Sequence, residues 1–306
     1  HLWQAVGMLG ASRRRILQQP YQPYRYGDWR GEVRSGWEDV FAGDPFGVLG
    51  EFSTSVIRDR ISKRVTRIDM GVDHGVIYLT HATSIKDNAG RFHRLLWWAG
   101  RSRVFSELRA SRALESAGLR VPMVLLVARR RTPRIEEVLV TRDEGMSTLY
   151  DRLNAGLGEQ ANRSLFRMAG RCAADLHRAG FKHGDLLPGN VLVMPDGSDL
   201  AYLDNERTVY RGGIPSSSGR NNNLVQMVFR GLLQRPWAEV RAFLDGYGER
   251  FGAGEDVWRR RRYRVIRRVR QRLKPWHANE KRLIPPSHRP FGGLGRKRRT
   301  LDASSR

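Results

Sequence analysis

One stretch of the sequence decides the fold: it reads His183-Gly184-Asp185-Leu186-Leu187-Pro188-Gly189-Asn190, and Leu203-Asp204 follow it along the chain. Between them, two short apolar runs at residues 191–194 and 200–203 enclose a turn sequence, Pro195-Asp196-Gly197-Ser198. Apolar runs on both sides of such a turn predict a β-hairpin. A hairpin of this length returns Asp204 to a place beside Asn190.

The polar residues of this stretch match the catalytic loop and metal-binding segment of kinase-like phosphotransferases. Phosphoryl transfer uses an aspartate that orients the attacking hydroxyl, an amide oxygen for Mg²⁺, and a second aspartate that bridges the metal to the nucleotide phosphates. Asp185, Asn190 and Asp204 can fill these roles, with the spacing of the H-x-D-x-x-x-x-N pattern. His183 is expected to support the loop, because Asp185 already supplies the base. The expected cofactors are ATP and Mg²⁺.

The residues before the loop support the same interpretation. Apolar side chains recur at helical spacing over residues 162–179, and Gly180 ends the pattern just before His183. Asp and Asn are common in turns of any kind, so their presence alone carries little weight. The agreement on both sides of His183 is what favours the kinase-like pattern.

The preceding part of the chain has the element order of a kinase small lobe. Residues 65–70 and 76–80 predict a hairpin, residues 103–117 a helix, and residues 123–128 and 137–141 two further strands. The sequence therefore predicts an α+β, protein-kinase-like fold of two lobes. The small β-rich lobe is expected at residues 48–141 and the larger, mainly helical lobe at residues 142–250.

A kinase small lobe supplies a strand lysine for the nucleotide phosphates and a helix glutamate that holds it. Glu107 is the expected glutamate, since it lies near the start of the predicted helix. At the end of the 76–80 strand, Thr80 and His81 stand where the lysine is expected. Lys86 is the nearest candidate, on the face of Thr80 if the strand continues, and otherwise an exposed loop lysine. No G-x-G-x-x-G occurs, and residues 47–55 hold the only hints of a phosphate-covering loop.

Two segments flank the predicted lobes. Residues 1–47 predict an irregular leader packed on the small lobe through Trp29, Trp37, Phe41 and Phe46. Residues 251–306 predict a basic helical segment, with an apolar stripe that includes Val265 and Val269, and then a mobile tail after Pro275. The net charge is +24, and this last segment holds 18 Lys and Arg against 4 Asp and Glu. Such a surface attracts polyanions.

Composition excludes several classes of protein. The single cysteine, Cys172, cannot form an internal disulfide, and its helical surroundings favour a buried structural thiol. No apolar run is long enough to span a bilayer, and the basic residues at the start follow the apolar ones, the reverse of a secretory signal. We expect a cytoplasmic protein.

The sequence resembles the lipopolysaccharide kinase family (the Kdo/WaaP, InaA-like group) over roughly residues 64–250. The resemblance is carried by Val65-Thr66-Arg67-Ile68, Val76-Ile77-Tyr78-Leu79, Ser106-Glu107, residues 113–122, residues 176–186 with Asn190, and residues 203–207. It implies transfer of the ATP γ-phosphate to a sugar hydroxyl of the lipopolysaccharide inner core, at the inner face of the cytoplasmic membrane. It also places the catalytic aspartate on Asp185 and the metal ligands on Asn190 and Asp204.

A basic surface suits an anionic glycolipid acceptor and implies peripheral contact with an anionic membrane surface. The same loop residues also look like those of aminoglycoside and choline kinases, so a small-molecule phosphotransferase is an alternative. The missing strand lysine, with Asn205-Glu206 after Asp204, leaves open a pseudokinase that binds polyanions. Nucleic acid is the less favoured partner, because the basic segment has few aromatic residues for base stacking. The sequence specifies neither the acceptor hydroxyl nor the oligomeric state.

Overall fold

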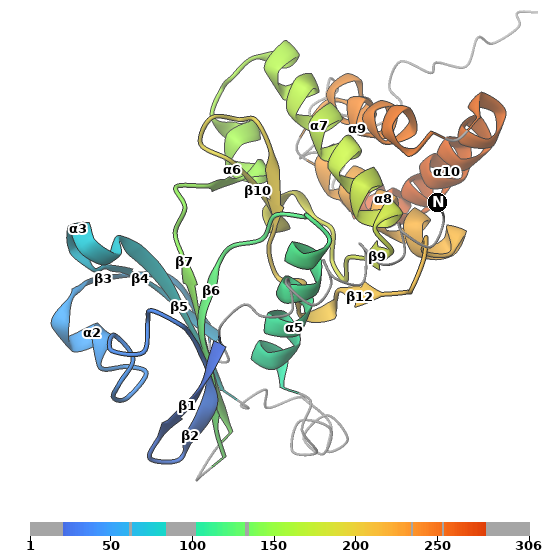
Figure 1. The fold of residues 1–306 in the computed structure, drawn as a ribbon. Helices are drawn as coiled ribbons and strands as arrows, with labels where there is room; N and C mark the ends of the chain where they lie inside the picture. Colours follow the sequence, from blue (N-terminus) through green and yellow to red (C-terminus); the bar gives the residue numbers. More distant parts are fainter. Residues whose placement is uncertain are drawn as a thin grey trace, which may run out of the picture. The chain divides into compact units, whose positions relative to one another are not determined.

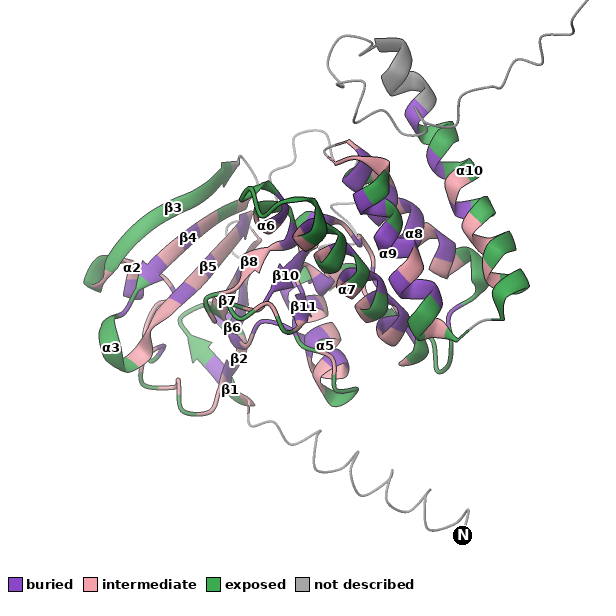
Figure 2. Ribbon diagram, turned by 90° about the horizontal axis from the view of Figure 1, so that it is seen from above, coloured by how far each residue is buried: buried purple, intermediate pink, exposed green. Residues whose placement is uncertain are grey.

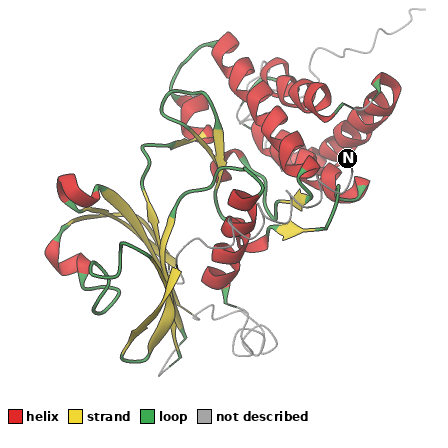
Figure 3. Cartoon of the chain, in the orientation of Figure 1, coloured by secondary structure: helices red, strands yellow, loops and turns green. Residues whose placement is uncertain are grey.

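A computed structural model of the chain describes residues 21–60, 63–83, 102–131, 135–233, 235–252 and 254–279. The fold is α+β, with a β-rich N-terminal lobe and a helical C-terminal lobe, as expected (Figure 3). The chain forms two compact units. The first holds the residues up to 152 with 176–185 and 189–215, and the second holds 153–175, 186–188 and the residues from 216 onward. The catalytic loop and its hairpin therefore belong mainly to the first unit.

The first unit is built on a seven-stranded antiparallel sheet of order β1-β2-β6-β7-β5-β4-β3 (Figure 1). Its strands are β1 (Tyr21–Tyr26), β2 (Trp29–Arg34), β3 (Ser53–Arg60), β4 (Lys63–Asp69), β5 (Val76–Thr83), β6 (Val124–Arg130) and β7 (Glu136–Arg142). The predicted hairpin of β4 and β5 is confirmed, with a single helical turn, α3 (Gly71–His74), between the strands. The expected strands β6 and β7 pair with each other as well.

Within the predicted leader, residues 21–26 and 29–34 are strands of this sheet, which corrects the expectation of an irregular segment there. β1 and β2 form a hairpin, and β2 pairs with β6, for example Val33 opposite Leu126. Pro23 lies in β1, an edge strand, which is where a sheet tolerates proline. Residues 47–55 also differ from expectation, because they form α2 (Val48–Glu51) and the start of β3 in place of a loop.

One face of the sheet carries the main hydrophobic core of this unit. Ile68, Ile77 and Leu79 lie there with aromatic residues from the N-terminal segment. Trp29 and Phe41 are buried in this core, while Trp37 and Phe46 pack against it, so these four residues have the packing role expected of them. Burial of several large aromatic side chains contributes roughly 2 kcal/mol each.

The opposite face of the sheet carries α5 (Arg103–Ser116), the predicted small-lobe helix (Figure 1). Ser102 caps its N-terminus, since the Ser102 hydroxyl accepts the N–H of Phe105 at 3.2 Å. Val104 and Leu108 pack on Val124 and Val127 of β6. The helix thus has a fixed place over the centre of the sheet.

Short elements follow the sheet in the first unit. β10 (Val191–Val193) and β11 (Leu200–Tyr202) form the predicted hairpin, and β8 (Ser147–Thr148) pairs with β10. A second small ladder joins β9 (Phe181–Lys182) to β12 (Val209–Tyr210). Two 3-10 turns, η1 (Pro188–Asn190) and η2 (Asn205–Arg207), lie next to these strands.

The second unit is helical. It is made from most of α7 (Glu159–Arg178), with α8 (Ser217–Leu232), α9 (Trp237–Phe251) and α10 (Glu255–Asn279); the short α6 (Leu149–Asn154) precedes α7. Backbones of α7 and α9 approach closely at two glycines. A Cβ on Gly170 would lie 2.0 Å from the carbonyl oxygen of Phe243, and one on Gly246 would lie 2.1 Å from that of Arg167. Only glycine fits at this crossing.

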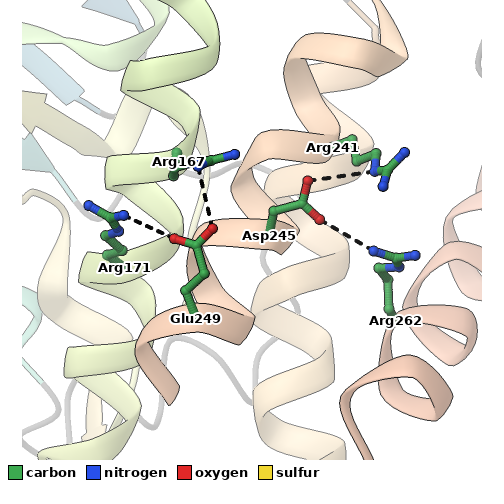
Figure 4. A network of polar contacts seen from close by, with 6 residues as sticks. All are labelled: Arg167, Arg171, Arg241, Asp245, Glu249 and Arg262. Carbon is green, nitrogen blue, oxygen red and sulfur yellow. Dashed lines mark hydrogen bonds and ion pairs between the residues drawn. The ribbon is translucent and has the colours of Figure 1, made fainter. Parts of the chain in front are cut away.

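Ion pairs on the surface of this unit link three of its helices (Figure 4). Glu249 of α9 pairs with Arg167 at 3.5 Å and Arg171 at 3.0 Å, both on α7. Asp245 of α9 pairs with Arg241 at 3.6 Å and with Arg262 of α10 at 3.3 Å. Exposed pairs of this kind contribute at most about 1 kcal/mol each. Their main effect here is to neutralise these arginines.

α10 is amphipathic, with an apolar stripe toward the unit and an arginine-rich outer face (Figure 2). Val265, Val269 and Leu273 are fully buried, as the sequence pattern predicted for the first two. The helix does not stop at Pro275 but continues to Asn279, because a proline removes one hydrogen bond without necessarily ending a helix. The expected mobile tail at residues 280–306 lies outside the described residues. None of the helices described is long and apolar enough to cross a membrane.

Candidate active site

His183 ties the catalytic loop to the end of the hairpin. Its ring is fully buried, the Asp185 main-chain N–H donates to Nδ1 at 3.0 Å, and Nε2 donates to the Leu203 carbonyl at 3.2 Å. Burial lowers the pKa of His183, which keeps the imidazole neutral in the tautomer that these two bonds require. The geometry matches the supporting role expected from the sequence.

Asp185 and Asn190 are joined across the loop. The Asn190 side-chain amide donates to the main-chain oxygen of Asp185 at 2.9 Å, which leaves Oδ1 as the atom that can accept a cation. Asn190 is also held to the hairpin, because its carbonyl accepts the Leu203 N–H at 3.0 Å. The hairpin therefore returns the chain to Asn190 immediately before Asp204, as its length predicted.

Asp204 has an unusual backbone conformation. Its φ is 62° and its ψ is 50°, and no other non-glycine residue in the described part of the chain has a positive φ. Asp and Asn tolerate this left-handed region better than other L-residues. Negative charges of both Asp204 and Asp185 act on His183, so both carboxylates lie near this buried ring.

Gly184 is required for a reason that the sequence did not suggest. A Cβ at this position would lie 2.1 Å from the Cβ of Arg207. The Cα and carbonyl carbon of Arg207 would be 2.9 Å away. Gly184 thus lets the catalytic loop pack directly on η2, the turn that follows Asp204.

Glu107 connects α5 to the same turn. Its buried carboxylate accepts the main-chain N–H of Asn205, while Arg103, one helical turn earlier, pairs with Glu206 at 3.3 Å. Asn205 is fully buried and its side-chain amide donates to the Tyr202 carbonyl at 2.9 Å. The two residues that depart from the expected pattern after Asp204 therefore serve to anchor α5.

The environment of Glu107 predicts a distinctive pH dependence. Burial is the main cause that raises the pKa of Glu107 to about 7; the Asn205 N–H and Lys63 oppose the rise, and the nearby Asp204 and Glu206 add to it. In the unfolded chain the carboxyl ionises near pH 4.5, so the folded state loses stability relative to it as pH rises from 4.5 to 7. The Glu107→Gln variant has no ionisable group at this position, so it should not lose this stability as the pH rises. Its unfolding free energy should exceed that of the wild type by about 3 kcal/mol above pH 7 and by little below pH 4.5.

Urea unfolding over this pH range, without Mg²⁺, measures the difference. Arg109→Gln, an exposed change on the same helix, is the control and should show no such trend. A Glu107→Gln difference that does not vary with pH would contradict the proposed ionisation.

The residues present fit a magnesium–nucleotide site. Asn190 Oδ1 and the half-buried Asp204 carboxylate would supply two oxygen ligands, and Mg²⁺ is commonly held by one or two carboxylates together with substrate phosphates. Within the described ranges, no group of three His, Cys, Asp or Glu side chains is arranged to hold a metal by itself. Asn205 Oδ1 is buried there without a hydrogen-bond partner in the described structure.

The lysine expected to bind the nucleotide phosphates, Lys86, is not placed by the structure. Lys86 lies outside the described residues, and β5 ends before it at Thr83. His81 pairs with Glu136 at 3.5 Å and packs on Phe46, so it faces away from α5. The sequence indicated no role for Arg103, Glu206 or Lys63. Their contacts join segments far apart in the chain, so local sequence patterns could not predict them.

The α+β fold and the arrangement of these residues are consistent with a kinase-like family of proteins. A model of the lipopolysaccharide kinase (Kdo/WaaP) family matches residues 56–247, and the chain belongs to this family. The matched residues include β4, α5, the catalytic loop and Asp204, close to the extent of the resemblance seen in the sequence.

Relatives named 3-deoxy-D-manno-octulosonic acid kinase include proteins of two bacteria. The chain is 36% identical over 142 residues to the protein of Stenotrophomonas maltophilia, covering 44% of this chain and 53% of the relative. It is 30% identical over 197 residues to that of Xanthomonas campestris pv. campestris, covering 63% of this chain and 76% of the relative. The chain thus spans about half the length of the first of these relatives.

Proposed function

We propose that this protein transfers the γ-phosphate of ATP to a sugar hydroxyl of the lipopolysaccharide inner core or a related glycolipid. The observation that carries the proposal is a set of hydrogen bonds at the buried His183: Asp185 and Leu203, the residue before Asp204, both bond to its ring, and Asn190 bonds to the main chain of Asp185 and of Leu203. Relatives named 3-deoxy-D-manno-octulosonic acid kinase support that sugar as the acceptor. The basic composition suits a substrate that carries phosphates and carboxylates.

Each residue has a proposed role in the transfer. Asp185 accepts the proton of the acceptor hydroxyl. The hydroxyl oxygen then forms the new bond to the γ-phosphorus while the bond between that phosphorus and the departing ADP breaks. Asn190 and Asp204 would hold Mg²⁺, which neutralises charge on the nucleotide phosphates. Glu107 is a positioning residue that orients the nucleotide-binding lysine. Lys86 stays a prediction for that lysine from the sequence alone.

A transfer assay tests this function directly. Purified protein with Mg²⁺ and γ-labelled ATP is offered lipopolysaccharide with unphosphorylated core sugar, an aminoglycoside and choline in separate reactions. We expect label in the lipopolysaccharide only. Label in the aminoglycoside or choline alone would support the small-molecule phosphotransferase. Polyanion binding without transfer to any acceptor would support the pseudokinase.

The outer face of α10 is the proposed contact with an anionic membrane surface. Arg260, Arg264 and Arg267 recur at helical spacing and are exposed. No carboxylate of the described residues forms an ion pair with them, in contrast to the arginines of Figure 4. Like charges at this spacing repel, so the row is better suited to an anionic partner than to an isolated helix.

Replacing two of these arginines tests the membrane contact. Each cation near an anionic bilayer contributes about 1 kcal/mol, so Arg264→Gln with Arg267→Gln should weaken binding to phosphatidylglycerol vesicles by about 30-fold. Co-sedimentation with vesicles measures the change. The control is Arg167→Gln with Arg171→Gln, which removes the same charge from residues paired with Glu249. Equal losses in both double variants would show a non-specific charge effect.

A further inference from the structure

The register of the sheet shows which side chains face α5. Glu137 of β7 accepts the main-chain N–H of Arg103 at the start of α5, so Glu137 lies on the α5 face. Ala82 of β5 is opposite Glu137, and Lys63 of β4 is opposite Ala82. Residues opposite each other in an antiparallel sheet share a face. Lys63 therefore lies on the face of the sheet that α5 covers.

On the same face, β5 offers no cation. Thr80 is opposite Leu139, which packs against α5, and alternation places Val76, Tyr78 and Ala82 on that face too. In a kinase small lobe, a lysine at Thr80 or Ala82 would bind the nucleotide phosphates. Neither position has one, and His81 points to the other face, where burial lowers its pKa and disfavours its charged form.

Lys63 is close enough to supply the missing charge. It is directly across from Ala82 and diagonal to Thr80, since Val65 is opposite Thr80. Neighbouring strands lie about 5 Å apart, and the four-carbon stem of lysine can span such a distance. Lys63 can thus bring its ammonium group to the place that a lysine on β5 would occupy.

The surroundings of Lys63 call for an anionic ligand. Its positive charge acts on the buried Glu107, where it opposes the effects of Asp204 and Glu206. Arg103 is already paired with Glu206. Lys63 is half-buried, and it forms no ion pair within 4.0 Å with any carboxylate that the structure describes. Its ammonium group therefore remains available to a phosphate.

We propose that Lys63 of β4 binds the nucleotide phosphates in this protein, in place of the lysine that β5 lacks, with Glu107 as the carboxylate that orients it. The inference rests on the proposed function, because it takes ATP as the ligand. It differs from the sequence prediction, which gave this role to Lys86.

Calorimetric titration of Mg²⁺-ATP into the full chain tests the assignment. Lys63→Gln removes one charge-assisted hydrogen bond to phosphate and should weaken ATP binding by about 10- to 100-fold. The matched control is Arg64→Gln, the next residue on the same strand, which is exposed and paired with Asp59. It should bind ATP as the wild type does. Lys86→Gln distinguishes the two assignments, because the sequence prediction expects the loss of ATP affinity in that variant instead.

Two further measurements separate phosphate binding from a structural role. The KM for ATP should rise in Lys63→Gln while the KM for the acceptor stays unchanged, and adding Thr80→Lys to that variant should restore ATP affinity. Unchanged ATP affinity in Lys63→Gln, loss in Lys86→Gln instead, or no recovery with Thr80→Lys would each overturn the proposal. A wild-type protein that binds no ATP would contradict the proposed function itself.

Discussion

Asp185→Asn is expected to lower the rate of phosphate transfer by about 10²- to 10⁴-fold while leaving ATP affinity within about twofold of the wild type. The substitution removes the group that accepts the hydroxyl proton. It keeps the main-chain N–H that Asp185 donates to His183 and the carbonyl that accepts from Asn190. The loop should therefore keep its structure and lose its base. Single-turnover kinetics with γ-labelled ATP measures the rate of the chemical step.

Asp196→Asn is the matched control for this experiment. Asp196 is exposed in the turn between β10 and β11, where it bonds only to Ser198 among the described residues. Its substitution by Asn should leave transfer unchanged. A rate for Asp185→Asn within tenfold of the control would contradict the role of Asp185 as base.

Asp204→Asn should lower the rate of phosphate transfer by about 10³-fold, because it removes a proposed metal ligand instead of the base. Charge stabilisation by a bound metal amounts to several kcal/mol, and this change removes the one carboxylate proposed to hold Mg²⁺. Asn tolerates the left-handed backbone of this position, so the turn into η2 should persist. The loss should therefore appear in Mg²⁺-dependent ATP binding and not in the thermal unfolding temperature.

The dependence on metal separates the two aspartates. ATP binding by Asp204→Asn should respond little to added Mg²⁺, whereas Asp185→Asn should respond like the wild type. Asp204→Ala serves as a comparison, because alanine is disfavoured at a φ of 62° and should lower stability as well. If Asp204→Asn bound Mg²⁺-ATP as tightly as the wild type, the proposed metal site would be wrong.

Local signals in the sequence predicted the parts of the site that local structure builds. The turn at residues 195–198 fixed the hairpin, and helical periodicity fixed α5 and α7. The pairing of β2 with β6 could not be found this way, because it joins Val33 to Leu126 across a long stretch of chain and β1 carries Pro23. The position of Lys63 on the α5 face could not be predicted from the sequence for the same reason. Its facing depends on the register of three strands and on the helix that covers them.

The contacts between α5 and η2 have a consequence for the dynamics of the first unit. Since the Asn205 amide hydrogen is held by Glu107, and Arg103 pairs with Glu206, α5 cannot open without releasing the turn that carries Asp204. Native-state hydrogen exchange should therefore show the Asn205 amide opening with the same free energy as amides in the middle of α5. Glu107→Ala should uncouple the two. The helix and the metal-binding turn are thus expected to form one cooperative unit.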